Sequence, residues 1–161
     1  MKTIDGRGLT ARGYQPVCPF RHKFVSHYIS GAFCVNDGTS LLLEQSHCSG
    51  EMFQHFLDKL SQQETKSLCL LIVDNAGFHK AKALRVPDNI VLIFQPPYSP
   101  EVNAAEKVWW SLKRAMHNRF FKTIDELREQ TDKWLKALTQ KQIKDIVAFD
   151  YVLEAIHYRN L

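Results

Sequence analysis

The chain has 161 residues, of which 45% are hydrophobic and 24% charged, and its formal net charge is +4. This length fits one ordinary domain, residues 1–161, with a sizeable core. The composition excludes a disordered or membrane-spanning class and is typical of a soluble globular protein. The mild positive charge suits an anionic partner such as nucleic acid, although many basic proteins bind none.

The cysteines and the apolar runs indicate the cellular compartment of the protein. The four cysteines form neither a C-x-x-C pair nor the even, close spacing of a disulfide framework. We therefore expect reduced thiols and no zinc site. The longest apolar runs, residues 68–73 and 90–94, are too short to cross a bilayer, and residues 1–5 do not open a signal peptide. These features predict a cytoplasmic protein without membrane contact.

The first half of the chain predicts a loop, a hairpin and a helix. Residues 1–23 combine glycines and prolines with basic side chains and indicate an extended loop. Residues 24–35 and 40–45 predict two strands, because residues 36–38 (Asn-Asp-Gly) tolerate the positive φ of a tight turn. Ser49 is expected to cap a helix. Its core positions, at helical spacing, are Met52, Phe53, Phe56, Leu57 and Leu60.

Two further strands are predicted by short apolar runs. Residues 68–73 and 90–94 are apolar at every position, which is typical of strands buried on both faces. Strands alternating with a helix indicate an α/β fold. Residues 95–100 contain three prolines and can form neither a helix nor a central strand.

The remaining chain predicts helices with clear N-terminal signals. Asn103 is expected to cap the first of them, and residues 123–126 form a capping box that opens the next. Residues 139–142 repeat that pattern and open a shorter helix. The helix after Asn103 has one stripe at helical spacing that we expect in the core, namely Ala105, Val108, Trp109, Leu112 and Met116, and a more polar one, namely Glu106, Trp110, Lys113 and His117.

Asp74 and Glu106 are the two candidate catalytic acids. Asp74 ends a buried strand, where open α/β sheets place reactive groups, but with Asn75 it could equally start an Asx-turn. Glu106 taken alone suits a capping interaction with Asn103 better. The two acids taken together favour the catalytic interpretation over the structural ones. An acid after a strand and an acid in the first turn of a helix are brought toward one place. Carboxylate oxygens are the natural ligands of Mg²⁺.

Other polar residues have competing interpretations. His79 could orient a phosphate or water, whereas a His at the head of a short helix is more often at the surface. Trp110 and Lys113 could stack on and neutralise DNA, yet a Trp beside another Trp is more often in the core. Basic residues are frequent in this part of the chain and would suit a phosphate-facing surface. They are Lys80, Lys82, Arg85, Lys107, Arg114, Arg119 and Lys122.

These residues resemble a known family. Asp74-Asn75 with His79, the segment PPYSPEVNAAE ending at Glu106, and then Trp109 and Lys113 resemble the DDE transposases of the bacterial IS630 group, which is related to the Tc1/mariner elements. The similarity also covers KTIDGRGLTARG, FLDKLSQ and TIDELRE, and so nearly the whole chain. Its most specific part is the PPYSPE-x-N-x-x-E segment.

The resemblance implies a fold, a cofactor and site residues. It implies an RNase H-like mixed sheet flanked by helices, in which three acids hold two divalent metals, Mg²⁺ or Mn²⁺. Asp74 would be the second acid and Glu106 the third, with Asn75, His79 and Asn103 supporting them. The implied partner is DNA, cut at the element's ends and joined to a target that is usually TA.

The first catalytic acid of the family has no counterpart in this chain. It precedes the segment resembling KTIDGR, which here follows Met1 directly, and Asp5, Asp37 and Glu44 are not obvious replacements. The resemblance thus predicts that the first, central strand and the helix-turn-helix region are missing. Unpaired strand edges cost about 1–3 kcal/mol per buried group, so we expect a chain that is marginal, aggregates, or borrows a strand from an upstream transposase fragment or another copy.

Three functional hypotheses follow. The leading one is the catalytic domain of an IS630-type transposase, N-terminally truncated, that cleaves DNA and transfers strands. The second is a catalytically inactive fragment that binds DNA or associates with transposase subunits. The third, an RNase H-type nuclease acting on hybrids, is disfavoured by the Pro-rich loop and the final helix.

Overall fold

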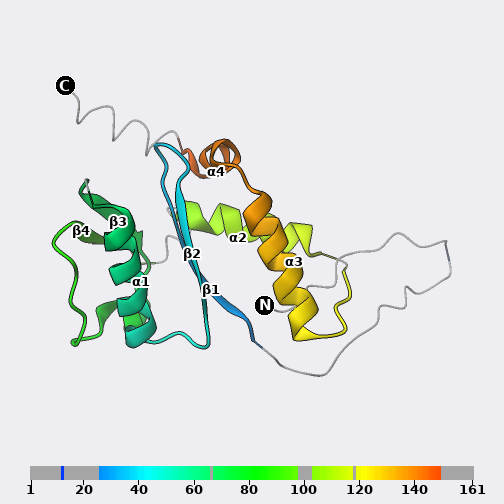
Figure 1. The fold of residues 1–161 in the computed structure, drawn as a ribbon, viewed down its shortest axis with the longest axis horizontal. Coiled ribbons are helices and arrows are strands. Elements are labelled where there is room, and N and C mark those ends of the chain that lie inside the picture. The colour runs from blue at the N-terminus through cyan, green and yellow to red at the C-terminus, as the bar shows by residue number, and fades with distance from the viewer. Residues whose placement is uncertain (1–11, 13–25, 66, 98–102, 118, 150–161) are drawn as a thin grey trace.

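The computed structural model describes residues 12, 26–65, 67–97, 103–117 and 119–149 (Figure 1). Its elements are β1 (Tyr28–Phe33), β2 (Ser40–Gln45), α1 (Gly50–Gln63), β3 (Cys69–Val73), the 3-10 helix η1 (Gly77–Lys80), β4 (Ile90–Phe94), α2 (Ala104–Ala115), α3 (Ile124–Ala137) and α4 (Gln140–Val147). This order confirms the α/β class. Most of the predicted basic loop and part of the Pro-rich loop lie outside the described residues.

Strands β1 and β2 form the predicted hairpin. They pair antiparallel, from Tyr28 with Gln45 to Phe33 with Ser40. The turn between them is closed by the Cys34 amide, which donates to the Thr39 carbonyl at 2.8 Å. Gly38 has a φ of 77°, the left-handed conformation that the Asn-Asp-Gly pattern indicated. The first strand starts four residues later than the sequence predicted.

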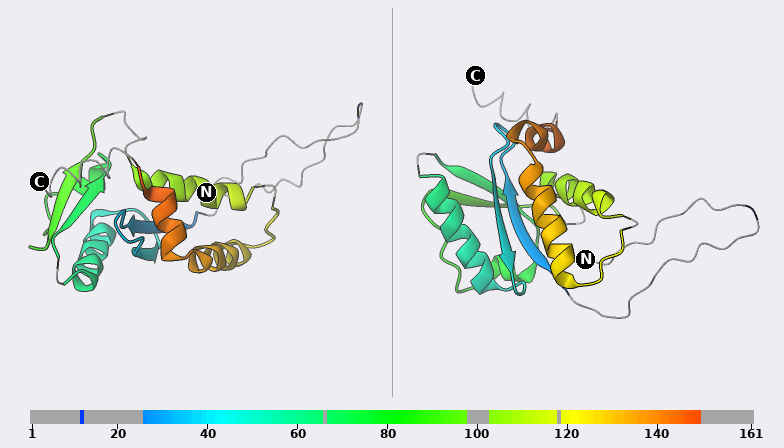
Figure 2. Two further views of the ribbon diagram at one scale, coloured as in Figure 1. Left: turned by 90° about the horizontal axis from the view of Figure 1, so that it is seen from above. Right: turned by 45° about the vertical axis from the view of Figure 1, so that its right-hand side comes forward.

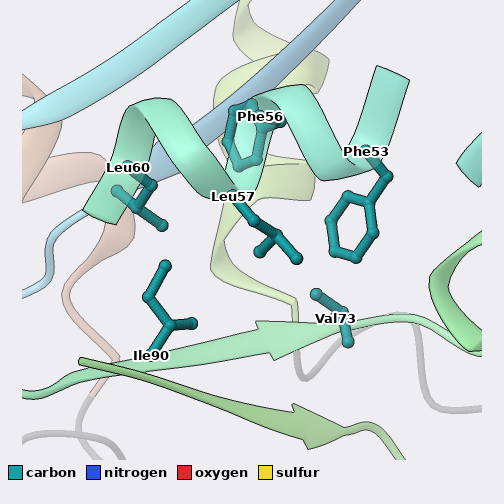
Figure 3. Close-up of a cluster of buried hydrophobic side chains, with 6 residues drawn as sticks. All are labelled: Phe53, Phe56, Leu57, Leu60, Val73 and Ile90. Atoms are coloured by element: carbon teal, nitrogen blue, oxygen red, sulfur yellow. The ribbon is translucent and has the colours of Figure 1, made fainter. Parts of the chain in front are cut away.

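Helix α1 supplies one side of the main core. Ser49 caps it as predicted, with its hydroxyl oxygen accepting a hydrogen bond from the Met52 amide at 3.2 Å. Figure 3 shows its side chains directed at the strands, with Leu60 facing Ile90 and Phe53 facing Val73. Burying an apolar side chain of this size contributes roughly 1.5–3 kcal/mol. The buried set of this cluster is Phe53, Phe56, Leu57, Leu60, Val73 and Ile90.

Strands β3 and β4 pair in parallel, with Cys69 opposite Ile90 and Val73 opposite Phe94. The expectation that both strands are buried on both faces is wrong. Helix α1 covers only the face that carries Val73 and Ile90, whereas the opposite face stays exposed. The residues of that exposed face are Leu70, Ile72, Val91 and Ile93, between 39% and 45% accessible. In this chain, therefore, a continuous apolar run does not indicate that a strand is covered on both faces.

The strands form two separate pairs in the described part of the chain, β1 with β2 and β3 with β4. Both pairs pack against α1, because Ala32 of β1 and Leu71 of β3 contact the same buried cluster. No backbone ladder joins the two pairs within the described residues. Antiparallel and parallel pairing occur together, so the arrangement is mixed, as predicted.

Helix α2 lies on the side of the hairpin opposite to α1 (Figures 1 and 2). Trp109 anchors it, since its ring meets Phe33 edge to face with centroids 5.5 Å apart. Gly31 makes this approach possible, because a Cβ there would lie 2.9 Å from the Trp109 ring. The predicted core stripe is confirmed, with Val108 and Leu112 fully or nearly buried.

Helices α3 and α4 complete the layer around α2. The Thr123 hydroxyl accepts from the Glu126 amide at 3.1 Å, as predicted. The Glu126 carboxylate, however, accepts from the Lys122 amide at 2.6 Å and not from Thr123. At the start of α4 the capping box is complete, because Thr139 and Gln142 bond each other reciprocally. Local capping thus fixes where each helix begins.

An ion-pair cluster joins the hairpin to α3. His27 Nε2 lies 3.2 Å from Glu44 Oε1, and Arg128 Nε lies 3.0 Å from the same oxygen. The His27 side chain is only 7% exposed. Burial lowers the pKa of His27 below its ordinary value of 6.5, an effect that Glu44 opposes and Arg128 reinforces.

Cys34, Cys48 and Cys69 are free thiols, in agreement with the predicted absence of disulfides for these three residues. Burial raises the pKa of Cys69. The longest helices of the described residues have 14 residues, and none is long and apolar enough to cross a bilayer.

Gly38→Ala should lower the free energy of unfolding by about 2–5 kcal/mol, because it adds left-handed backbone strain and a steric clash. The added Cβ would lie 1.8 Å from the Gln140 carbonyl oxygen. Urea denaturation measures the effect. Gly77→Ala is the matched control, since no atom lies within 4 Å of its Cβ, and it should change stability by less than about 1 kcal/mol. Equal losses in both variants would contradict the predicted clash.

Acidification should destabilise the protein through His27. The folded chain favours neutral His27, so the unfolded chain binds more protons, and the stabilisation present above pH 6.5 is lost as the pH falls toward the lowered pKa. His27→Gln should therefore show a shallower loss of unfolding free energy between pH 7.5 and 5.5, roughly one unit either side of the ordinary histidine value. Parallel pH profiles for the variant and the parent chain would count against this role.

Candidate active site

Asp74 follows directly after β3 and starts the turn that leaves this strand. Its Oδ1 accepts a hydrogen bond from the Ala76 amide at 3.0 Å, which is the Asx-turn that the sequence suggested. The same oxygen lies 2.8 Å from His79 Nδ1. The Asp74 side chain is nevertheless 58% exposed. The turn therefore fixes the carboxylate without burying it, and leaves it open to a ligand.

His79 orients Asp74 from the 3-10 helix η1. Its side chain is only 14% exposed and packs against Phe53, with ring centroids 4.3 Å apart. His79 is therefore half-buried and contacts the acid, so it is more than a free surface residue. A carboxylate can only accept a hydrogen bond, so the Nδ1 atom of His79 must carry the proton. A histidine held in this way fixes one acid in place, as supporting residues at metal sites do.

Asn75 ties the ends of the two parallel strands together. Its Nδ2 donates to the Gln95 carbonyl oxygen at 2.7 Å, and the Gln95 amide donates to the Val73 carbonyl at 2.9 Å. Lys80 donates in turn to the Asn75 side-chain oxygen. Asn75 and Gln95 thus fix the backbone on either side of Asp74.

Sequence reasoning missed Lys80 and Gln95 as members of this cluster. Gln95 is only 7% exposed, and its Nε2 has no hydrogen-bond partner within the part of the chain that the structure describes. No motif could have indicated either contact, because each joins residues brought together by the pairing of β3 with β4 and by the η1 turn. Only the polar character of Gln95 at the end of an apolar strand gave a signal.

Glu106 lies in the first turn of α2. The predicted N-cap is confirmed, because Asn103 Oδ1 accepts from the Ala105 amide at 3.1 Å. The Glu106 carboxylate does not take part in capping, and among the described residues no hydrogen bond or ion pair engages it. The side chain is exposed. The capping interpretation of this acid is therefore wrong, and its carboxylate is available to a ligand.

Trp110 and Lys113 lie on the same outer surface of α2. Trp110 is 60% exposed, as its place on the more polar stripe predicted, so the competing interpretation of a core residue is wrong, whereas Trp109 packs inward. The Arg114 guanidinium lies over the Trp110 ring, 5.3 Å from its centroid. Lys113 is exposed. The surface around Glu106 is thus aromatic and positively charged.

The described residues form two groups, one around Asp74 and one on α2. Neither a hydrogen bond nor an ion pair links them, and this part of the chain holds no cluster of three or more His, Cys, Asp or Glu side chains suited to a metal ion. The possible replacement acids are engaged elsewhere. Asp37 accepts from the Thr39 amide at 2.8 Å within the turn, and Glu44 pairs with His27 and Arg128. Asp5 lies outside the described residues.

The carboxylate oxygens of Asp74 and Glu106 are of the type that a hard divalent cation prefers. Asp74 and Glu106 are exposed carboxylates, and Mg²⁺ is typically bound through one or two carboxylates together with waters and phosphate oxygens. No sulfur ligand is near Asp74 in the contacts found there. Each of the two carboxylates is thus of a chemical type that suits Mg²⁺.

Comparison with known proteins identifies the family. The model of the DDE superfamily endonucleases matches residues 2–128. The chain therefore belongs to the DDE superfamily endonucleases, as its motifs predicted. A protein of Sinorhizobium fredii (strain NBRC 101917 / NGR234), called "Uncharacterized protein y4pE/y4sA", is 38% identical over 102 residues, which are 62% of this chain and 76% of that protein.

Two solved structures share the fold. The Mos1 transposase paired-end complex with left transposon end has a TM-score of 0.65 at 15% identity, and the Mos1 strand transfer complex a TM-score of 0.66 at 17% identity. Each match covers 89% of this chain and 46% of the other, so the chain spans about half the length of the Mos1 chains. The similarity confirms the RNase H-like α/β fold.

Proposed function

We propose that the chain is the catalytic domain of an IS630-type DDE transposase, which cleaves DNA and transfers strands with a divalent metal. The observation that carries the proposal is the state of its two acids. Asp74 is fixed at the end of β3 by His79 yet stays exposed, and Glu106, in the first turn of α2, has no hydrogen-bond or ion-pair partner among the described residues. In a DDE superfamily endonuclease, exposed acids in these places suit catalysis better than structure.

In this proposal Asp74 and Glu106 would hold Mg²⁺ or Mn²⁺. The bound metal would supply activation of water or of a 3′-hydroxyl and charge stabilisation during in-line displacement at phosphorus. The protein contributes orientation, because the bond from His79 fixes the Asp74 carboxylate and Asn75 fixes the backbone beneath it. Asn103 fixes the first turn of α2 and hence the direction of Glu106.

The proposed partner is DNA, at the ends of an element and at a target that is TA in this group. The names of the two similar structures describe Mos1 transposase bound to a transposon end or after strand transfer. On this chain Trp110 and Lys113 would contact the DNA next to Glu106, since both are exposed on α2. A base can stack on the indole, and the ammonium can neutralise a phosphate.

We further propose that a strand from outside the described residues completes both the sheet and the acid set. The pairs β1–β2 and β3–β4 both pack on α1 without a ladder between them. One strand inserted between them would satisfy unpaired backbone groups and could carry the first acid. An upstream transposase segment would supply both the strand and the acid, whereas another copy of the chain could supply a strand but carries no counterpart of the first acid.

A second candidate function is DNA binding or subunit association without catalysis. The observation that favours it is the absence, within the described residues, of a cluster of three metal-binding side chains. The basic surface of α2 would remain useful to such a protein. The two functions differ in one result, because only the first gives metal-dependent cleavage.

In the chain joined to its upstream segment, Asp74→Asn and Glu106→Gln should each reduce Mg²⁺- or Mn²⁺-dependent cleavage of a labelled duplex carrying the element's ends by more than about 100-fold. Loss of a supporting residue alone typically costs 10–100-fold, and a metal-binding carboxylate should cost more. Glu51→Gln is the matched control, since Glu51 is the first-turn acid of α1. It should cleave normally. DNA bound but uncut by every variant and by the parent chain would support the second candidate instead.

Joining the upstream segment to the chain should raise the cleavage rate and the melting temperature together, because the same strand would fill the sheet and bring the missing acid. Each satisfied buried backbone group contributes about 1–3 kcal/mol. Gel assays and thermal melts of the chain with and without the segment measure both effects. A 161-residue chain that is monomeric, melts cooperatively well above room temperature and cuts DNA unaided would rule out the need for a further strand.

A further inference from the structure

The most exposed large apolar side chain among the described residues is Trp110, at 60% accessibility. Its neighbours on α2 show that this exposure is not a packing failure. Val108 is fully buried, Leu112 is 4% exposed, and Trp109 packs against Phe33. The apolar face of α2 is therefore already complete without Trp110. An indole kept outside a well-packed helix is a candidate binding surface.

Arg114 gives this indole a defined setting. Its guanidinium lies over the ring, 5.3 Å from the centroid, one helical turn after Trp110. A planar cation over an aromatic face is attracted to the ring and limits its rotation. Trp110 keeps most of its surface accessible even with Arg114 in place. The pair therefore presents a preformed flat surface with a positive charge behind it.

The position of this pair along α2 relates it to Glu106. Trp110 and Arg114 follow Glu106 at intervals of four residues, so all three lie on one side of the helix. Four residues advance a helix by about 6 Å. Successive nucleotides of a DNA strand are about 3.4 Å apart along the axis. A DNA strand that runs along α2 would therefore place a ligand at Trp110 about two nucleotides from a phosphate held at Glu106.

The chemistry of the surface selects what can bind. An indole recognises a nucleobase through its flat face, independently of sequence. Inside a duplex both faces of each base are covered by stacked neighbours, so only a terminal or extruded base is accessible to the ring. Arg114 adds a cation that suits the flanking phosphate.

We propose that Trp110, backed by Arg114, stacks on an unpaired base within about two nucleotides of the reacting phosphate. The substrate at this site would then be a DNA end with a frayed or extruded base, and not an intact duplex. The inference rests on the proposed function for the place of Glu106. It goes beyond general DNA contact because it predicts a preference between two forms of the same DNA.

The test is binding of two duplexes of identical length to the full 161-residue chain in EDTA, so that no cleavage occurs. One duplex is fully paired. The other has an unpaired 2-aminopurine two nucleotides from its end, and the fluorescence of this base is quenched by stacking. The parent chain should bind the unpaired form about 5- to 150-fold more tightly and quench its fluorescence.

Trp110→Leu should reduce that preference to about one and abolish quenching, whereas Trp110→Phe should retain part of both because it keeps an aromatic face. Arg114→Lys keeps the charge but not the planar group, so it should weaken the preference while binding of paired DNA stays close to normal. Phe120→Leu is the matched control, an aromatic residue 51% exposed outside α2. It should leave the preference unchanged.

Two results would overturn the inference. One is an equal loss of affinity for both duplexes in Trp110→Leu, which would make the indole a general DNA contact. The other is an unchanged preference with altered sedimentation, which would place Trp110 in an interface between copies of the chain. Failure of the proposed function is separable, because it would abolish metal-dependent cleavage while leaving the preference measured in EDTA intact.

Discussion

The structure depends on the apolar face of α1. Leu57 and its neighbours on this helix hold two strand pairs that share no hydrogen bonds with each other in the described part of the chain. Because no backbone ladder joins β1–β2 to β3–β4 among the described residues, side-chain packing on α1 sets the position of Asp74 relative to the hairpin there. Because the core is densely packed, a small change in side-chain volume on this face of α1 would disturb both strand pairs.

A second contact places the other acid. Trp109 packs on the bare backbone at Gly31 and against Phe33, and this fixes α2 on the opposite side of the hairpin from α1. Glu106 lies one turn before Trp109 on the same helix, so the packing of Trp109 also fixes the orientation of Glu106. The two candidate acids are thus carried by different layers, each fixed to the hairpin by a different cluster. Their relative position is a property of the assembled fold.

Each polar residue near the acids has one identifiable task. His79 fixes the Asp74 carboxylate, Asn75 joins the ends of β3 and β4, and Asn103 caps α2. None of these bonds buries its acid. Orientation without burial is what an acid needs if it is to bind a metal and a phosphate, since burial would raise the cost of keeping its charge. The site is therefore organised to keep charge accessible.

The sequence by itself determined the elements, their caps and the identity of the candidate acids. These signals are local, because a cap at Ser49 or Asn103 and an alternating stripe are set within a few residues. Only the tertiary structure decided that the second face of β3 stays uncovered and that His79 packs against Phe53 beside Asp74. Each of these depends on which distant element covers a surface, and no local pattern encodes that choice.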